Sequence, residues 1–314
     1  MTKNKNIKAI PGNPSTAYSS KHHLNDRSNG LPLKVLTESD WDFWVQNGYV
    51  ILRQAVPKNL TAKVSKMLWE FEEKDPADIS TWYAKESKEM EMKELTNSGM
   101  VEVYNHQYLW DVRQYPRVHE AFSDIWGMEN LWVTIDRANL NLPSRPGFEF
   151  KGFIHWDYDP ETNPQNVQGL VALNDQDDTT VGGFQCIPEL YRTYESWKKD
   201  QPKDRDHFKP DTSGFELTKV KLMEGDLLIF NSKLPHGIRP NLSENKVRMA
   251  QYISMMPAEE DNEEMRDWRI SSWKNSISPE GYAFPGDPRN WEQIKYPKAE
   301  LSPLGKKLLG VTPW

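Results

Sequence analysis

The sequence predicts a mainly β protein with flanking helices, an α+β chain whose core is a double-stranded β-helix of the jelly-roll, cupin-like type. Two observations predict this fold. Residues 131–257 contain seven or eight short runs of β-branched and aromatic residues, separated by turn signals. Apolar residues at helical spacing lie mainly before this region, in residues 36–130. Short strands spaced by turns, with helices before them, are typical of a double-sheet jelly-roll barrel.

Composition limits the classes of protein to consider. The 314 residues carry a formal net charge of −7, which argues against a general binder of nucleic acid or anionic membranes. The sequence has no apolar run of about 18 residues and no apolar segment near its start, so we expect neither a membrane-spanning helix nor a secretion signal. Cys186 is the one cysteine, and we expect a small buried hydrophobe in a cytoplasmic protein.

The chain divides into a tail and one domain. Residues 1–35 are rich in Lys, Asn, Ser, Pro and Gly, and we expect them to be a disordered tail. We expect residues 36–314 to form a single domain. Its parts are a helical N-terminal flank at 36–130, the jelly-roll core at about 131–257 and a charged, Trp-bearing C-terminal extension at 258–314.

The first helix of the N-terminal flank has clear start and stop signals. Thr37 is a predicted N-cap followed by acidic residues, and Gly48 closes the helix. A short strand follows at residues 50–52. A second helix opens at Pro57, and its apolar residues fall on one face.

Other segments outside the core strands are less regular. Residues 72–99 are densely charged, which predicts either a solvated helical excursion or a lid over a pocket. Helices are expected at residues 118–126 and 303–309. Residues 189–216 are predicted to be a long surface loop with one helix.

The strands of the core follow from short apolar runs bounded by turn residues. They are expected at residues 132–141, 153–159, 166–174, 182–188, 217–223, 226–231, 236–240 and 246–256. Three polar side chains, Arg137, Asn139 and Asn141, share one face of the first strand. Because buried polar groups need partners, this face is expected to look into a cavity or into solvent.

Candidate metal ligands lie on two of these strands. His155 and Asp157 alternate along a strand, so both side chains point to the same face. His236 follows another strand at the predicted mouth of the barrel. Two imidazoles and one carboxylate with open positions form the facial triad of non-haem Fe(II) oxygenases. The open positions can accept a chelating 2-oxo acid and then O2.

A chelating 2-oxo acid with a second carboxylate needs a cation deep in the barrel. Arg248 lies on the last strand and can bind a carboxylate with two parallel hydrogen bonds. Arg239 is nearer to His236 in sequence but precedes Pro240 in a turn. We therefore favour Arg248 and keep Arg239 as the alternative.

Four separated motifs resemble those of the phytanoyl-CoA dioxygenase family, a branch of the Fe(II)/2-oxoglutarate oxygenases. They are residues 153–157, residues 183–188, residues 225–231, and His236-Gly followed by Arg248. They occur in the order expected for that family, and the resemblance extends over most of residues 36–257.

The resemblance implies a reaction and its cofactors. Fe(II) would be held at His155, Asp157 and His236, and the distal carboxylate of 2-oxoglutarate would bind Arg248. With O2, 2-oxoglutarate is converted to succinate and CO2 while an unactivated C–H of a small molecule is oxidised. Halogenating relatives carry a small residue at the position of Asp157, so the resemblance favours hydroxylation.

Two departures from the family pattern concern the substrate. Leu170 stands where the phytanoyl enzyme is expected to carry Trp beside the co-substrate, and the loop at residues 189–216 differs. Both argue against phytanoyl-CoA itself as the substrate.

Further contacts are expected around the pocket. Gln168 would hydrogen-bond the co-substrate or the substrate. Arg137 would anchor an anionic substrate group or form a salt bridge within the sheet, and Asn139 would face the same cavity. Three residues of the N-terminal flank could cap the pocket, although a structural role is favoured for the first of them: His106, Trp110 and Trp82.

Two other function classes fit the same fold. One is a different cupin-type metalloenzyme, such as an isomerase or a dioxygenase that needs no 2-oxo acid. The other is a non-catalytic jelly-roll binding protein, for which a broken triad would be expected. The sequence favours an enzyme that acts on a small molecule, with no nucleic-acid or membrane partner, and makes no prediction of the oligomeric state.

Overall fold

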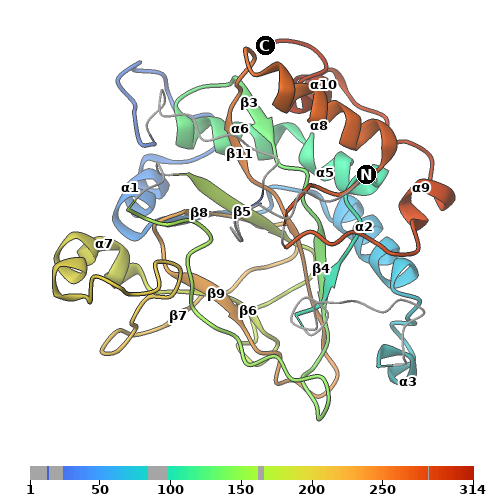
Figure 1. Cartoon of the computed structure of the whole chain (residues 1–314), viewed down its shortest axis with the longest axis horizontal. Coiled ribbons are helices and arrows are strands. Elements are labelled where there is room, and N and C mark those ends of the chain that lie inside the picture. Colours follow the sequence, from blue (N-terminus) through green and yellow to red (C-terminus); the bar gives the residue numbers. More distant parts are fainter. Residues whose placement is uncertain (1–12, 14–23, 84–97, 162–165, 282) are drawn as a thin grey trace.

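The computed structural model describes residue 13 and residues 24–83, 98–161, 166–281 and 283–314. Two antiparallel sheets form its centre, and most helices lie on one side of the larger sheet (Figure 1). This arrangement confirms the predicted mainly β fold with flanking helices and a jelly-roll core.

The larger sheet has six strands in the order β1-β8-β5-β10-β4-β2. Neighbouring strands are antiparallel throughout. The strands in chain order are β1 (Tyr49–Leu52), β2 (Met100–Val101), β4 (Ala138–Asn141), β5 (Val167–Ala172), β8 (Leu227–Asn231) and β10 (Arg248–Tyr252).

A smaller sheet faces the larger one and has the order β7-β6-β9. Its strands are β6 (Gly183–Cys186), β7 (Thr218–Lys219) and β9 (His236–Arg239). A separate pair joins β3 (Leu131–Val133) to β11 (Met255–Pro257). Side chains from both sheets fill the space between them, including Leu170 and Phe230 from the larger sheet and Phe184 from the smaller.

The central strands of the larger sheet are apolar on both faces. On β8, Leu228 and Phe230 pack toward the smaller sheet, whereas Leu227 and Ile229 pack toward the helices. Alternation along a strand directs successive side chains to opposite faces, so one strand serves two cores. The helices on the outer face are α2 (Lys58–Phe71), α5 (Gln107–Arg113), α6 (Pro116–Trp126), α8 (Glu263–Asn275) and α10 (Pro303–Leu309).

The sequence correctly located two helices, the first of them from its capping signals. Helix α1 (Glu38–Asn47) begins after Thr37, which forms a capping box with Asp40, and ends at Gly48 with a φ of 73°. Helix α10 occupies the residues predicted for the C-terminal helix. The remaining short helices are α3 (Ile79–Trp82), α7 (Pro188–Trp197), η1 (Lys198–Asp200) and α9 (Trp291–Lys295).

Three predicted strands differ in the structure. The strand expected at 132–141 is broken into β3 and β4, which belong to different sheets, and the strand expected at 246–256 is likewise broken into β10 and β11. Both breaks occur where the two paired segments pass from the larger sheet to the separate β3–β11 pair. The strand expected at 153–159 makes a single bridge, from His155 to His236.

Parts of two predicted segments lie outside the described residues. Most of the expected disordered tail, residues 1–35, is not described, but residues 24–35 are, and the main-chain N–H groups of Lys34 and Val35 bind the Asp124 carboxylate on α6. Of the charged segment at residues 72–99, predicted to be a solvated helical excursion or a lid, residues 84–97 are not described.

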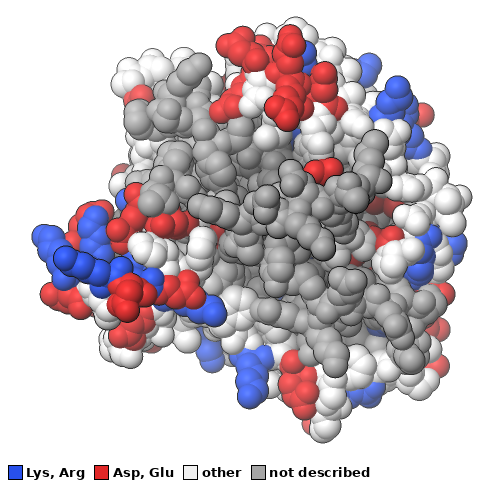
Figure 2. Space-filling model, viewed as in Figure 1, with Lys and Arg blue, Asp and Glu red and all other residues white. Residues whose placement is uncertain are grey.

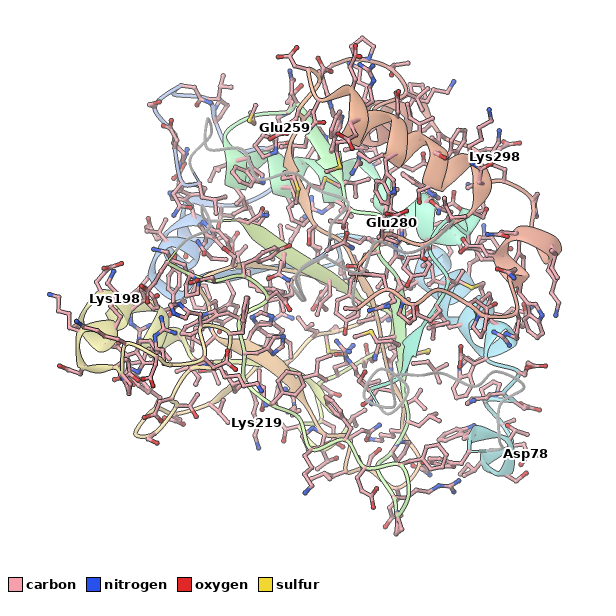
Figure 3. The ribbon with its side chains drawn as sticks, in the orientation of Figure 1. Asp78, Lys198, Lys219, Glu259, Glu280 and Lys298 are labelled. Carbon is pink, nitrogen blue, oxygen red and sulfur yellow. The ribbon has the colours of Figure 1, made fainter. Side chains whose placement is uncertain are left out.

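Charged side chains of the described residues are mixed around the rim of the face in Figure 2. An acidic group lies at the top, near Glu259 in Figure 3, and basic and acidic side chains alternate over α7, near Lys198. Among the described residues on this face, no extended basic surface is visible. Within the described part of the chain, no helix has both the length and the apolarity needed to cross a membrane.

A buried arginine fastens the C-terminal extension to the core. Arg269 on α8 is fully buried, and its guanidinium donates to the main-chain oxygens of Val133 on β3 (2.6 Å), Leu308 (3.0 Å) and Leu309 (3.2 Å) on α10. One side chain thus joins three elements that are distant in the sequence.

We expect Arg269→Ala to lower the free energy of unfolding by about 3 kcal/mol, because it leaves a cavity and three unpaired carbonyl groups. Urea denaturation followed by tryptophan fluorescence would measure the change. Arg266→Ala on the same helix is the matched control, since its ion pairs are partly exposed, and should cost less than about 1 kcal/mol. Equal losses in both variants would contradict this role of Arg269.

Candidate active site

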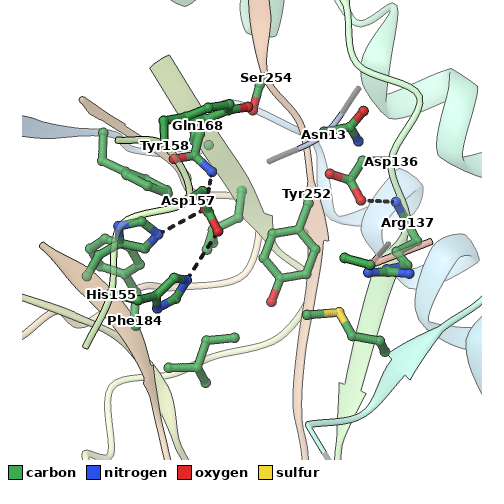
Figure 4. A pocket seen from close by; sticks show the side chains of 18 of the residues that line it. Asn13, Asp136, Arg137, His155, Asp157, Tyr158, Gln168, Phe184, Tyr252 and Ser254 are labelled. Carbon is green, nitrogen blue, oxygen red and sulfur yellow. Dashed lines mark hydrogen bonds and ion pairs between the residues drawn. The ribbon is translucent and has the colours of Figure 1, made fainter. Parts of the chain in front are cut away.

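His155 and Asp157 (Figure 4), which are close in the sequence, meet His236 from a distant strand beside the space between the two sheets. One ligand atom from each of His155, Asp157 and His236 lies within 4.8 Å of the other two. The Asp157 carboxylate lies between the imidazoles, with 3.2 Å from Oδ1 to His155 Nε2 and 3.4 Å from Oδ2 to His236 Nε2. The structure therefore brings the three predicted metal ligands together.

Backbone pairing produces this meeting. His155 donates its N–H to the oxygen of His236 (2.9 Å), and His236 donates its N–H to the oxygen of His155 (3.1 Å). A Cβ on Gly237 would lie 1.9 Å from the oxygen of Phe153. The close approach of the segments around His155 and His236 therefore requires glycine after His236.

Packing and one hydrogen bond orient the His236 ring. Its Nδ1 lies 2.9 Å from the main-chain oxygen of Leu234, which leaves Nε2 directed toward Asp157. The ring also packs against Phe184 and Phe230, with centroid distances of 5.8 and 4.4 Å. Fixing one ring nitrogen in this way presents the other as a metal ligand.

The Asp157 carboxyl is adapted to remain ionised. Removal from water alone would raise its pKa, but the contacts with His155 and then His236 outweigh this and hold the pKa well below its usual range. Gln168 on β5 donates its amide N–H to Asp157 Oδ2 and fixes the carboxylate from the other side. The donor set fits a divalent ion that accepts two imidazoles and one carboxylate.

A cavity of about 170 Å³ opens beside the three ligands. Its wall near the ligands is largely aromatic and apolar, with Leu170, Phe184 and Phe230. Polar groups, Asp136 and Arg137, lie at its opposite side, and Tyr252 lies between the two ends in Figure 4. Burial raises the pKa of the Asp136 carboxyl above its usual value.

A guanidinium lies directly behind Tyr252. Arg248 is fully buried, and its Nη1 donates to Asn139 Oδ1 (2.8 Å) and to the Tyr252 hydroxyl (3.2 Å), while Nε lies 3.4 Å from Gln176 Oε1. These partners are uncharged, and Nη2 has no partner among the described residues. A buried charge without an anion is costly, so this position favours a bound anion.

Arg239 is a second buried cation in the same region. Its Nη1 donates to the main-chain oxygen of Phe184 (2.6 Å), and its Nη2 has no partner among the described residues. Burial lowers its pKa to about 10, and the nearby charge of Arg248 acts in the same direction. The two arginines thus lie close enough to influence one another electrostatically.

The structure separates the other predicted site residues into two groups. Gln168 and Arg137 line the cavity, and Asn139 is a partner of Arg248. The three residues expected to cap the pocket are not among those that line it: Trp82, Trp110 and His106.

Each of those three residues has a structural partner. The indole of Trp82 donates to the oxygen of Asp75, and that of Trp110 to Asn105 Oδ1. His106 is the N-cap of α5, since its Nδ1 accepts the N–H of Tyr108.

Four residues of this region were not predicted. Asp136 directly precedes Arg137, between β3 and β4. Tyr252 lies four residues after Arg248 on β10, so period-two alternation offered a signal for Tyr252, which shares a face with Arg248. Glu102 pairs with Arg137, and Phe284 lines the cavity from the C-terminal extension. Neither residue carries a sequence signal that would place it at a site in the core.

Comparisons with known proteins identify relatives of the chain. A family model described as phytanoyl-CoA dioxygenase matches residues 44–250. The chain is 27% identical over 245 residues to Ava biosynthesis cluster protein O of Aspergillus versicolor, covering 69% of this chain and 77% of that protein.

Solved structures share the fold. The protein of GlcNAc Inducible Gene 2 from Candida albicans superimposes with a TM-score of 0.64 at 12% identity, covering 89% of this chain and 78% of that one. The epimerase SnoN from nogalamycin biosynthesis, in complex with Fe3+, alpha ketoglutarate and nogalamycin RO, superimposes with a TM-score of 0.50 at 15% identity, covering 70% and 83%.

We expect the protein to bind one Fe(II) per chain in anaerobic calorimetric titrations. His236→Ala should weaken binding about a hundredfold or more because it removes a ligand, and Gln168→Leu about tenfold because it frees the Asp157 carboxylate. His106→Ala is the control and should bind Fe(II) like wild type. Unchanged Fe(II) affinity in His236→Ala would contradict the assignment of the metal ligands.

Proposed function

The chain belongs to the phytanoyl-CoA dioxygenase family of iron- and 2-oxoglutarate-dependent enzymes, and we propose that it hydroxylates an unactivated C–H bond of a small-molecule metabolite. The observation that carries this proposal is the position of the triad, beside a cavity. Behind the wall of this cavity lies a buried guanidinium that has no anionic partner among the described residues. A metal, an anion and a substrate can therefore be held at one place.

The side chains assign a role to each part of the site. His155, Asp157 and His236 would hold Fe(II), with Gln168 keeping the carboxylate in place. Iron held by these residues would, with 2-oxoglutarate and O2, supply the oxidising power for C–H cleavage, with conversion of 2-oxoglutarate to succinate and CO2. The apolar wall of the cavity excludes water from the reacting groups.

Arg248 is the proposed partner of the distal carboxylate of 2-oxoglutarate. Its uncharged neighbours leave its positive charge unbalanced, and an Arg can bind a carboxylate through two N–H groups. Arg239 is a second cation that strengthens the attraction for an anion. Rotation of the Tyr252 side chain would open the path between Arg248 and the cavity.

Retention of Asp157 supports hydroxylation over halogenation. Its carboxylate occupies the position that a halide would need beside the metal, and both of its oxygens already contact imidazoles. The intact triad and the buried arginine also favour an enzyme over a non-catalytic binding protein on the same fold.

We expect anaerobic protein with Fe(II) and 2-oxoglutarate to develop a visible charge-transfer absorption band. Arg248→Ala should raise the half-saturating concentration of 2-oxoglutarate by more than about a hundredfold, since it removes the charge that offsets a buried carboxylate. Arg239→Ala should raise it about tenfold. Arg192→Ala on the exposed side of α7 is the control and should leave it unchanged.

Absence of the band in wild type would contradict 2-oxoglutarate binding at iron. A band of normal strength with an unchanged half-saturating concentration in Arg248→Ala would contradict Arg248 as the partner of the distal carboxylate. If wild type shows the band, screening small molecules for stimulated succinate release would identify the substrate.

A further inference from the structure

We propose that Asp136 and Arg137 recognise the primary substrate, and that they select an uncharged group with a hydrogen-bond acceptor next to a donor, such as a carboxamide. This inference rests on the proposed function, because it assigns the substrate class for the same cavity. It replaces the expectation that Arg137 anchors an anionic group.

Asp136 and Arg137 line the cavity on the side opposite the triad, and Tyr252 lies between them and the metal ligands in Figure 4. A molecule that presents a C–H to the metal would therefore direct its other end toward these two residues. Phe284 lines the same end and offers an aromatic surface.

Arg137 is held rigidly before any substrate arrives. Its Nη1 donates to Glu102 Oε1 (2.6 Å) and to the Tyr104 hydroxyl (3.0 Å), and its guanidinium carbon lies 4.6 Å from the centroid of Phe284. Its Nε is buried without a partner among the described residues. A fixed guanidinium with an unused donor suits an acceptor oxygen on a ligand.

The charge of Arg137 is already balanced. Arg137 and Glu102 form an ion pair whose side chains are 5% and 0% exposed. The other oxygen of Glu102 accepts from the Tyr104 hydroxyl and from the N–H of Gly286 (3.1 Å), so the carboxylate is fully used on the side away from the cavity. An anionic ligand would therefore gain little from Arg137.

Arg248 and Arg239 provide the contrast within the same molecule. Their hydrogen-bond partners are uncharged, and neither contacts a carboxylate among the described residues. The described site thus has one cationic end suited to the co-substrate and one end suited to the substrate, where a carboxylate already pairs with the guanidinium.

Asp136 supplies the acceptor beside this donor. Its Oδ1 accepts the main-chain N–H of Arg137 (2.7 Å), which fixes the carboxyl on the cavity wall. A carboxylate on a ligand would be repelled by Asp136, and a cation would be repelled by a metal at the triad. A neutral carbonyl with an adjacent N–H or O–H satisfies both residues.

Three probes of nearly the same shape test this selection: benzamide, benzoate and benzamidine, which are neutral, anionic and cationic. Dissociation constants would be measured by ligand-observed NMR on protein loaded with Zn(II) and N-oxalylglycine, so that the metal and the anion site near Arg248 are occupied. We expect benzamide to bind at least about tenfold more tightly than either charged probe. Equal or tighter binding of benzoate or benzamidine would overturn the proposal.

Glu102→Gln tests the reason for the selection. The variant leaves Arg137 with an unbalanced charge, so the ratio of benzoate to benzamide affinity should rise at least about tenfold. Glu292→Gln is the matched control, because Glu292 is also buried behind this end of the cavity but binds the N–H groups of Tyr104 and Asn105 rather than Arg137. An unchanged ratio in folded Glu102→Gln would overturn the proposal.

If Glu102→Gln does not fold, the ranking of the three probes on wild type still tests the proposed selection of a neutral group. Asp136→Asn provides a second variant. Asp136→Asn removes the repelling charge and should also favour benzoate relative to benzamide. The proposed function fails separately, through the missing charge-transfer band, because probe binding requires neither 2-oxoglutarate turnover nor O2.

Discussion

The pair of backbone hydrogen bonds between His155 and His236 is the constraint on which the site depends. It joins His155, which lies outside the regular strands, to His236, the first residue of β9. The two imidazoles thereby lie on either side of the Asp157 carboxylate. The glycine after His236 makes the close approach possible. Without this pairing, neither sheet would hold the ligands within reach of one ion.

The region around the candidate metal ligands has two ends, which differ in the partners of their buried arginines. Near Arg248 and Arg239, the partners of the positive charge among the described residues are neutral, which favours a bound anion. Near Arg137, an ion pair with Glu102 balances the charge, and Asp136 adds an acceptor on the cavity wall. Under the two proposals, the same residue type would serve co-substrate binding in one place and substrate selection in the other, according to whether a carboxylate contacts it.

The fold and the metal ligands could be predicted from the sequence because local signals specify them. Capping residues located α1, and alternation placed His155 and Asp157 together. Breaks in the long strands were not predicted, because the passage of β3 and β11 into a separate sheet depends on pairing between distant segments rather than on local composition.

The substrate end of the cavity depends on contacts that no local pattern encodes. Glu102 precedes the core by many residues and Phe284 follows it, and both reach the cavity region through the packing of the flanking segments. The predicted cap of the pocket is the opposite case. Sequence reasoning assigned it to Trp82, Trp110 and His106, but each of these side chains has a structural partner instead. Tertiary packing decides such positions.

The most direct test of the account is a crystal structure of the protein prepared anaerobically with Fe(II) and 2-oxoglutarate, with anomalous scattering recorded at the iron edge. The account predicts one iron peak bonded to His155, Asp157 and His236, with the distal carboxylate of 2-oxoglutarate on Arg248. An iron peak elsewhere, or a distal carboxylate bound by Arg137 instead of Arg248, would contradict it.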